Sequence, residues 1–214
     1  GSPLLSSDYY GGFRRHVAAL LESPASAGTN GFVAMMSQGT SGDLMWMDYS
    51  APAKDIGYDA YAKAVAEKVA VVVRNLQFHD WVPLKMAERT LALNYRVPDE
   101  ARLAWARKMG QSFAGRLPGT QPEIYALESI YLHERPHTEL KLQALRIGDV
   151  GITALPNEVF ALTGLKLKAQ SPLATTFNIA LANGAEGYIP PPEQHKLGGY
   201  TTWPARTAGL EYQA

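Results

Sequence analysis

Cysteine is absent from the 214 residues, and neither sign of charge is in excess. The lack of cysteine excludes a disulfide framework, cysteine-ligated zinc or iron–sulfur centres, and thiol catalysis. Twenty Lys and Arg balance twenty Asp and Glu, so no large basic face is available and nucleic acid is not an expected partner. Long apolar runs are also missing. The best stretch, residues 62–73, carries Lys63, Glu67 and Lys68, so no transmembrane segment is expected.

The remaining composition is that of a globular protein. It is 46% hydrophobic and 19% charged, which lies outside the range of disordered chains, and a chain of this length can bury a sizeable core. The sequence opens Gly1-Ser2-Pro3 without Met, and no signal-peptide pattern follows. We expect a fragment of a longer chain.

Helical spacing of apolar residues recurs in the first two thirds of the chain. It predicts a helix that starts after Ser7-Asp8 and stops at the turn-rich run of residues 23–31, and three more at 58–76, 99–111 and 122–133. The last of these carries Pro in its first turn, where proline is favoured.

Strand patterns appear between and after these helices. The apolar run Phe32–Met36 predicts a strand buried on both faces, and the alternation over 91–97 predicts a half-buried strand that Pro98 ends. Two strands of a hairpin are predicted around the Gly148-Asp149 turn. Asn157 is expected to cap a helix at 158–170 before a strand at 175–182, which completes a strand–helix–strand unit. These elements predict an α/β fold of layered mixed β-sheets flanked by helices.

The tail from residue 186 to 214 has no period. It contains four Pro, four Gly, three Tyr and one Trp. A long aromatic segment of this kind is usually functional itself or packed over a functional site.

The segment His133-Glu134-Arg135-Pro136-His137 matches the zinc-binding pattern His-Glu-x-x-His of metalloproteases. That chemistry needs both histidines on one face of a continuous helix. Pro136 has no N–H to donate to Leu132 and its ring clashes with that carbonyl, so the helix is predicted to end there. A polar helix end, with basic groups near the negative end of the helix dipole, is the favoured interpretation.

The loop Gly39–Asp43 follows the predicted buried strand, where α/β proteins place ligand-binding loops. It matches neither a P-loop nor a dinucleotide-binding fingerprint, and a structural turn fits it equally well. Ser37 and Ser41 are candidate nucleophiles without a supporting motif. By spacing alone, Glu158 is a favourable charge at a helix start, and His195 is a loop histidine.

Three blocks of sequence resemble the neutral/alkaline non-lysosomal ceramidase family. They are Phe32–Asp43; Leu142–Asp149 with Leu155-Pro156-Asn157-Glu158-Val159-Phe160; and Asn183-Gly184 with Gly187-Tyr188-Ile189-Pro190 through Gly199-Tyr200. Their order and spacing also fit, so the resemblance covers the chain from about Asp8 to just beyond Tyr200.

The resemblance implies a zinc-dependent amidase of α/β architecture that hydrolyses the amide of ceramide to sphingosine and fatty acid. Such proteins act in sphingolipid metabolism and are secreted, periplasmic or attached to the cell envelope. The family's Zn²⁺ is held by two histidines, a Glu that maps onto Glu158 and a Tyr that maps onto Tyr188. A second Tyr, which stabilises the oxyanion and is the catalytic residue carried over, maps onto Tyr200.

This sequence departs from the family pattern at two places. None of its five histidines, His16, His79, His133, His137 and His195, falls in a matching motif. The family's histidines lie in the N-terminal half of the domain, so the resemblance implies that residues 1–214 are the C-terminal part of a ceramidase-like catalytic domain and that its N-terminal half supplies the remaining ligands. A serine discussed as a nucleophile in the family falls on Met45, whose thioether cannot attack an amide, whereas a zinc–water mechanism is unaffected.

Two alternatives stay open at the level of sequence: a non-catalytic ceramidase-like binding or scaffold module, and the His-Glu-x-x-His metalloprotease. The ceramidase interpretation makes a geometric prediction. A right-handed strand–helix–strand connection brings Glu158 and Tyr188 to the same edge of a sheet, and the tail must fold back to bring Tyr200 to them.

Overall fold

The computed structural model describes residues 5–21 and 33–214. The turn-rich run predicted at residues 23–31 lies outside the described residues. The chain divides into two compact units, one made of residues 1–37 and 45–81 and the other of residues 38–44 and 82–214.

The first unit is built on a pair of helices, α1 (Asp8–Leu21) and α2 (Tyr58–Arg74). Both were predicted from their apolar spacing. Phe13 and Val17 of α1 pack against Ala62 and Ala66 of α2, and all four side chains are buried. Small residues on both helices allow this close approach. A Cβ added to Gly12 of α1 would lie only 2.8 Å from the Cβ of Ala62 of α2.

The strand predicted at Phe32–Met36 does not form. Phe32 lies outside the described residues, and residues 33–36 have no partner strand. Val33 and Met35 are 63% and 87% exposed, whereas Ala34 and Met36 pack against the core of the helix pair. Alternate side chains of the run are therefore partly buried against helices instead of fully buried between strands.

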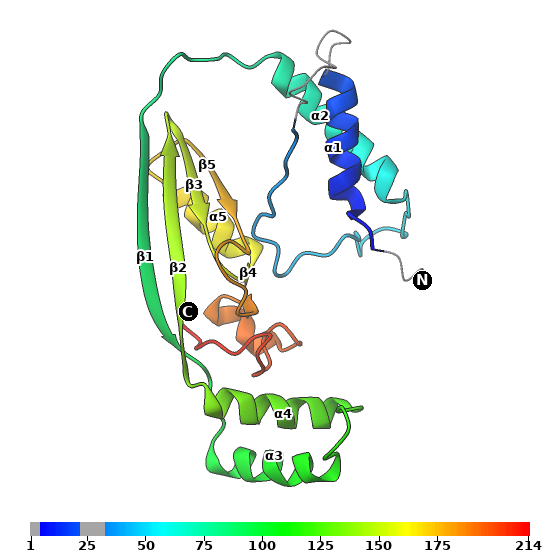
Figure 1. Ribbon diagram of the computed structural model, residues 1–214, viewed down its shortest axis with the longest axis vertical. Coiled ribbons are helices and arrows are strands. Elements are labelled where there is room, and N and C mark those ends of the chain that lie inside the picture. Colours follow the sequence, from blue (N-terminus) through cyan, green and yellow to red (C-terminus); the bar gives the residue numbers. More distant parts are fainter. Residues whose placement is uncertain (1–4, 22–32) are drawn as a thin grey trace. The chain divides into compact units, whose positions relative to one another are not determined.

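A four-stranded mixed sheet is the centre of the second unit (Figure 1). Its order is β1-β2-β3-β5, with strands β1 (Leu84–Asn94), β2 (His137–Ile147), β3 (Val150–Ala154) and β5 (Thr175–Ile179). The β2–β3 hairpin turns at Gly148-Asp149 as predicted, and β3 and β5 are parallel. The strand predicted at 91–97 begins earlier, at Leu84, because its pairing with β2 extends on the N-terminal side of the alternating segment. It ends at Asn94.

An antiparallel helix pair, α3 (Glu100–Ser112) and α4 (Gln121–Glu134), connects β1 to β2. Both helices were predicted within two residues of their observed ends. Asp99 caps α3 by accepting a hydrogen bond from the backbone of Arg102. Thr120 and Glu123 form a capping box at the start of α4. The Glu123 carboxylate also accepts hydrogen bonds from Arg116 and from the backbone of Gly119, and these lower its pKa to about 2.

The helix that joins β3 to β5 is shorter than the sequence predicts. α5 runs over Ala161–Gln170, so Glu158 does not open it and Asn157 is not its cap. Asn157 instead has φ 71°, a left-handed conformation that asparagine tolerates. The cap comes from a distant part of the sequence, because the carboxylate of Asp43 accepts a hydrogen bond from the backbone N–H of Ala161 at 2.7 Å.

The residues between β3 and α5 form a second, two-stranded sheet. β4 (Glu158–Val159) pairs in parallel with β6 (Tyr188–Ile189). After β6 the chain forms the 3₁₀ helix η2 (Pro192–Leu197) and a C-terminal segment that returns to the sheet, where Leu210 makes a bridge with Tyr95. The guanidinium of Arg96 holds this segment through carbonyls of Thr202, Ala208 and Leu210.

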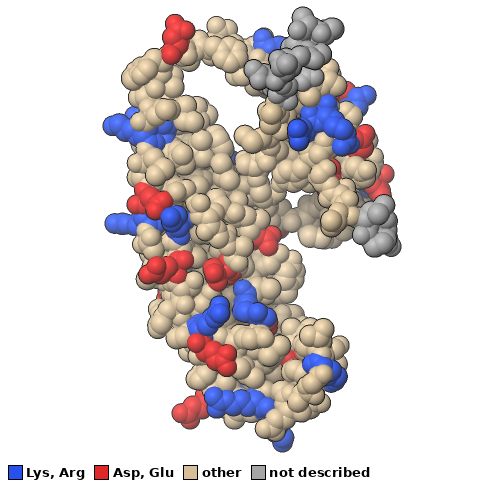
Figure 2. Space-filling view, in the orientation of Figure 1, with Lys and Arg blue, Asp and Glu red and all other residues tan. Residues whose placement is uncertain are grey.

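The architecture is therefore the expected α/β fold with mixed sheets and flanking helices. No helix in the described ranges is long and apolar enough to cross a membrane. Acidic and basic side chains are interspersed over the face seen in Figure 2, as the balanced composition implies.

Candidate active site

Glu158 and Tyr188 lie directly opposite each other in the small parallel sheet. The backbone N–H of Glu158 donates to the carbonyl of Gly187 at 3.0 Å, and the N–H of Tyr188 donates to the carbonyl of Thr207 at 2.7 Å. Both positions are therefore fixed by main-chain hydrogen bonds, and the two side chains come from strands that hold each other in register.

Tyr200 reaches the same place from the segment after η2. Its hydroxyl lies 3.3 Å from the hydroxyl of Tyr188, and the two rings pack edge to face with centroids 5.4 Å apart and an interplanar angle of 84°. The structure thus brings together the three residues that the resemblance singled out, although 42 positions separate the first from the last. Their roles as metal ligands and catalytic residue stay predictions.

Tyr188 interacts with both of the other side chains. Burial raises the pKa of Tyr188, and its interactions with Tyr200 and Glu158 raise it further. The hydrogen bond between the two phenols can run in either direction, because each hydroxyl can donate or accept.

Asn157 holds the turn that precedes Tyr188. It is fully buried, and its side-chain oxygen accepts the backbone N–H of Glu186 at 2.8 Å. Its own N–H donates to Gly184, and its carbonyl accepts from Leu181. These contacts join the end of β3 to the residues that lead into β6. Asn157 was predicted to cap a helix, and it instead fixes this turn through its side chain and backbone.

An ion pair between the buried carboxylate of Glu128 and the exposed guanidinium of Arg206 lies next to Glu158. Both oxygens of Glu128 accept from the guanidinium of Arg206, and Oε2 also accepts the backbone N–H of Arg206 at 2.8 Å. Glu128 is 9% exposed. Both residues line a cavity of about 330 Å³ together with Glu158 and Gly187. The sequence analysis missed this pair, because no motif links positions 78 residues apart.

The loop Gly39–Asp43 packs against the same strands. Gly42 donates its N–H to the carbonyl of Val159 at 2.9 Å, and a Cβ on Gly42 would lie only 2.5 Å from the carbonyl oxygen of Glu158. Ser41 accepts a hydrogen bond from Gln38 at 2.7 Å. With Asp43 capping α5, these contacts support the structural interpretation of the loop.

The His-Glu-x-x-His segment does not form a zinc helix. α4 ends at Glu134, and Pro136 stands outside it as predicted. His137 is the first residue of β2, where its Nδ1 lies 2.8 Å from the side-chain oxygen of Asn94. The metalloprotease alternative therefore lacks the continuous helix that it requires. Within the described residues, no group of three or more His, Cys, Asp and Glu side chains is arranged to hold a metal ion.

His195 is not the solvated loop histidine that the sequence suggested. Its ring packs edge to face on Tyr212, with centroids 4.7 Å apart. Burial lowers its pKa, and the nearby positive charge of Arg96 lowers it further.

Neither a protein-family model nor a curated protein sequence matches the chain. Solved structures do match, and two ceramidases are among them. Neutral ceramidase from Pseudomonas aeruginosa matches with a TM-score of 0.59 and 15% identity, over 99% of this chain and 39% of that chain. A ceramidase complexed with C2 matches with a TM-score of 0.62 and 13% identity, over 99% of this chain and 40% of that chain. This chain thus spans about two fifths of their length, and at these identities the likeness is one of fold.

Proposed function

We propose that residues 1–214 are the C-terminal part of the catalytic domain of a zinc-dependent amide hydrolase of the neutral ceramidase type. The observation that carries the proposal is the convergence of Glu158, Tyr188 and Tyr200. The similarity of the fold to two ceramidases supports it.

The donor set fits part of a zinc site. Glu158 offers a carboxylate and Tyr188 a phenol oxygen from paired strands, and zinc accepts oxygen ligands beside imidazole nitrogen. A catalytic zinc takes three protein ligands or more, so we assign the remaining ones to histidines in the N-terminal half of the same domain. When bound, the metal supplies a water whose pKa is lowered to about 7.

The side chains of this chain would then have distinct tasks. Glu158 and Tyr188 would hold the metal, in positions that the strand pairing fixes. Tyr200 is 57% exposed in this chain, so its side chain is not enclosed by the residues around it. We assign it to donate a hydrogen bond to the oxyanion that forms when water adds to the amide carbon. Such donors contribute about 3–4 kcal/mol to transition-state stabilisation.

The proposed substrate is the N-acyl amide of ceramide or of a related lipid. Water adds to the acyl carbon, the C–N bond breaks, and the nitrogen takes a proton, which yields a fatty acid and a sphingoid amine. This chemistry would place the protein in sphingolipid metabolism, at a secreted, periplasmic or cell-envelope location.

Two tyrosine substitutions test the assignment in a longer protein that includes the histidine-bearing half. Tyr188→Phe is expected to lower zinc content, because it removes a ligand. Tyr200→Phe is expected to retain zinc and to lower kcat by about 100- to 1000-fold, since it removes an interaction made in the transition state. Zinc is measured by elemental analysis and hydrolysis with a fluorescent ceramide.

Tyr49→Phe is the matched control, because Tyr49 is 74% exposed and makes none of the contacts described for the site; it should change neither quantity. Full zinc content in Tyr188→Phe would refute the ligand assignment. A protein that holds zinc and cleaves no lipid amide would favour the alternative, a non-catalytic ceramidase-like module.

A further inference from the structure

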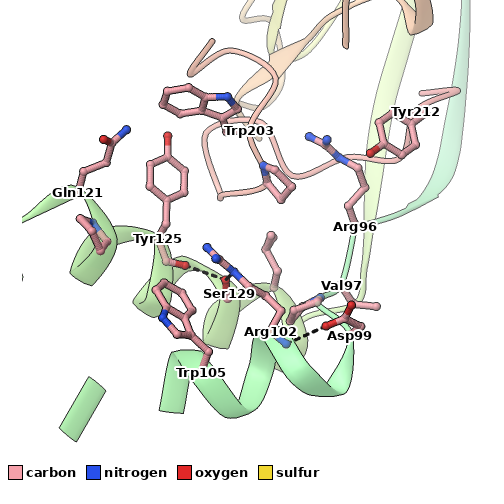
Figure 3. Close-up of a pocket in the computed structure, with 14 residues that line it drawn as sticks. Arg96, Val97, Asp99, Arg102, Trp105, Gln121, Tyr125, Ser129, Trp203 and Tyr212 are labelled. Atoms are coloured by element: carbon pink, nitrogen blue, oxygen red, sulfur yellow. Dashed lines mark hydrogen bonds between the residues drawn. The ribbon is translucent and has the colours of Figure 1, made fainter. Parts of the chain in front are cut away.

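A second cavity, of about 910 Å³, lies in the larger unit between α3, α4 and the C-terminal segment (Figure 3). It shares no lining residue with the cavity at Glu158. Its volume is within the range of pockets that bind small molecules. Four aromatic rings contribute to its wall: Trp105 from α3, Tyr125 from α4, and Trp203 and Tyr212 from the C-terminal segment.

The walls of this cavity are held in place by specific contacts. Trp203 packs edge to face on Tyr125, with centroids 5.6 Å apart and an interplanar angle of 74°. Arg96 ties the C-terminal segment to the end of β1 through three backbone carbonyls, and its guanidinium lies 5.0 Å from the ring centroid of Tyr212. These contacts hold the C-terminal segment, and with it the rings of Trp203 and Tyr212, against α4 and the end of β1.

Arg102 places a cation in this aromatic setting. Its guanidinium lies 3.9 Å from the ring centroid of Trp105, and its Nε donates to the hydroxyl of Ser129 at 3.3 Å. Ser129 is itself fixed, because its hydroxyl donates to the carbonyl of Tyr125 at 2.7 Å. Figure 3 shows the guanidinium extending from α3 toward Tyr125.

The two terminal nitrogens of Arg102 are left for a ligand. In the part of the chain that the structure describes, no carboxylate forms an ion pair with Arg102. Neither Nη1 nor Nη2 donates a hydrogen bond to another residue there. The carboxylate of Asp99 accepts the backbone N–H of Arg102. Two arginines and one aspartate thus line the cavity, so its field favours an anion.

Most of the remaining lining is apolar, and Gln121 is the polar exception. The apolar residues are Val97, Pro98, Pro122, Leu132 and Pro204. A guanidinium held by stacking presents two parallel N–H donors that match a carboxylate, and apolar walls beside it favour a ligand with a hydrocarbon body.

We propose that this cavity binds a single-chain amphiphile with a carboxylate head, the carboxylate on Arg102 and the chain against Trp203 and Leu132. The site is separate from the proposed amide hydrolysis, and its test involves no turnover.

The test uses the 214-residue chain and dodecanoate, followed by the indole N–H resonances of its four tryptophans. Trp105 and Trp203 are expected to shift saturably. Trp46 and Trp81, which belong to the other unit, serve as internal references and should stay in place. Acetate, which has the head without the chain, and dodecyltrimethylammonium, which has the chain with the opposite charge, are each expected to bind at least about tenfold more weakly.

Arg102→Gln should weaken dodecanoate binding about tenfold, since it removes a charge-assisted bidentate contact. Arg107→Gln, on the same helix and outside the cavity, is the matched control and should leave binding unchanged. Equal binding of the anionic and cationic amphiphiles would overturn the proposal in the unaltered chain, whatever the stability of the variant. So would equal affinity in Arg102→Gln and the control, or shifts confined to Trp46 and Trp81.

Discussion

Replacing Gly187 by alanine tests whether backbone packing positions Tyr188. Gly187 has φ 87° and makes a bridge with Ala208. A Cβ added to it would lie 2.3 Å from the carbonyl oxygen and 2.4 Å from the carbonyl carbon of Thr207. That same oxygen accepts the N–H of Tyr188, so the added methyl group must displace the partner that holds Tyr188 in register.

The expected cost has two parts. A positive φ costs a non-glycine residue about 1–2 kcal/mol. Displacing Thr207 adds the loss of one backbone hydrogen bond, about 1 kcal/mol, together with the unpacking around it. Gly115 separates the two parts, because its φ is 85° and nothing lies within 4 Å of an added Cβ. Gly115→Ala should therefore cost about 1.5 kcal/mol and Gly187→Ala about 3 kcal/mol or more.

Thermal unfolding followed by circular dichroism measures the difference. For a chain of this length 1 kcal/mol corresponds to a change in Tm of about 2–4 °C, so Gly115→Ala should lower Tm by about 3–6 °C and Gly187→Ala by about twice as much. Equal losses in the two variants would show that the contact with Thr207 does not constrain the site. The hydrogen bond from Tyr188 to Thr207 would then not be what holds Tyr188 in register.

Three further outcomes are expected. Dialysed 214-residue chain should retain far less than one zinc per chain in elemental analysis, because under the proposed assignment it would supply only two ligands of a site that takes three or more; one tightly held zinc would contradict this. The pKa of Glu123 is lowered from 4.5 to about 2, so its contact with Arg116 stabilises the folded state above about pH 4.5 and is lost as the pH falls toward 2. Urea titrations of Glu123→Gln should accordingly show a smaller loss of stability between pH 5 and 2 than the parent chain. Asp43→Ala should lower the free energy of unfolding by about 1 kcal/mol through loss of the cap at Ala161, whereas Asp43→Asn, which keeps an acceptor oxygen, should retain most of it.

Local patterns in the sequence predicted the elements whose stability is itself local. The helices at 8–21, 58–74, 100–112 and 121–134 follow apolar periodicity, and the last two also follow their own N-terminal caps. The β2–β3 hairpin follows its Gly148-Asp149 turn, and the parallel β3–β5 pair follows from the length of the connection. In each case the signal and the structure lie within the same stretch of chain.

The errors occur where a distant segment decides the local structure. Glu158 and Val159 read as the first turn of a helix, yet they pair as a strand because Tyr188 and Ile189 offer a parallel partner. The cap of α5 comes from Asp43, 118 positions away. No window of sequence contains such information, and neither Asp43 nor the pair of Glu128 and Arg206 could be assigned from spacing.

The candidate site also depends on contacts between residues that are far apart in the sequence. The resemblance named Glu158, Tyr188 and Tyr200, whereas the geometry that joins them comes from groups with no motif of their own. Thr207 accepts from Tyr188, and Arg206, its neighbour in sequence, is fixed to α4 by Glu128. The backbone partner of Tyr188 is therefore next in sequence to a residue that an ion pair ties to α4. A sequence motif can identify a site residue, but contacts with residues outside the motif determine where its side chain lies.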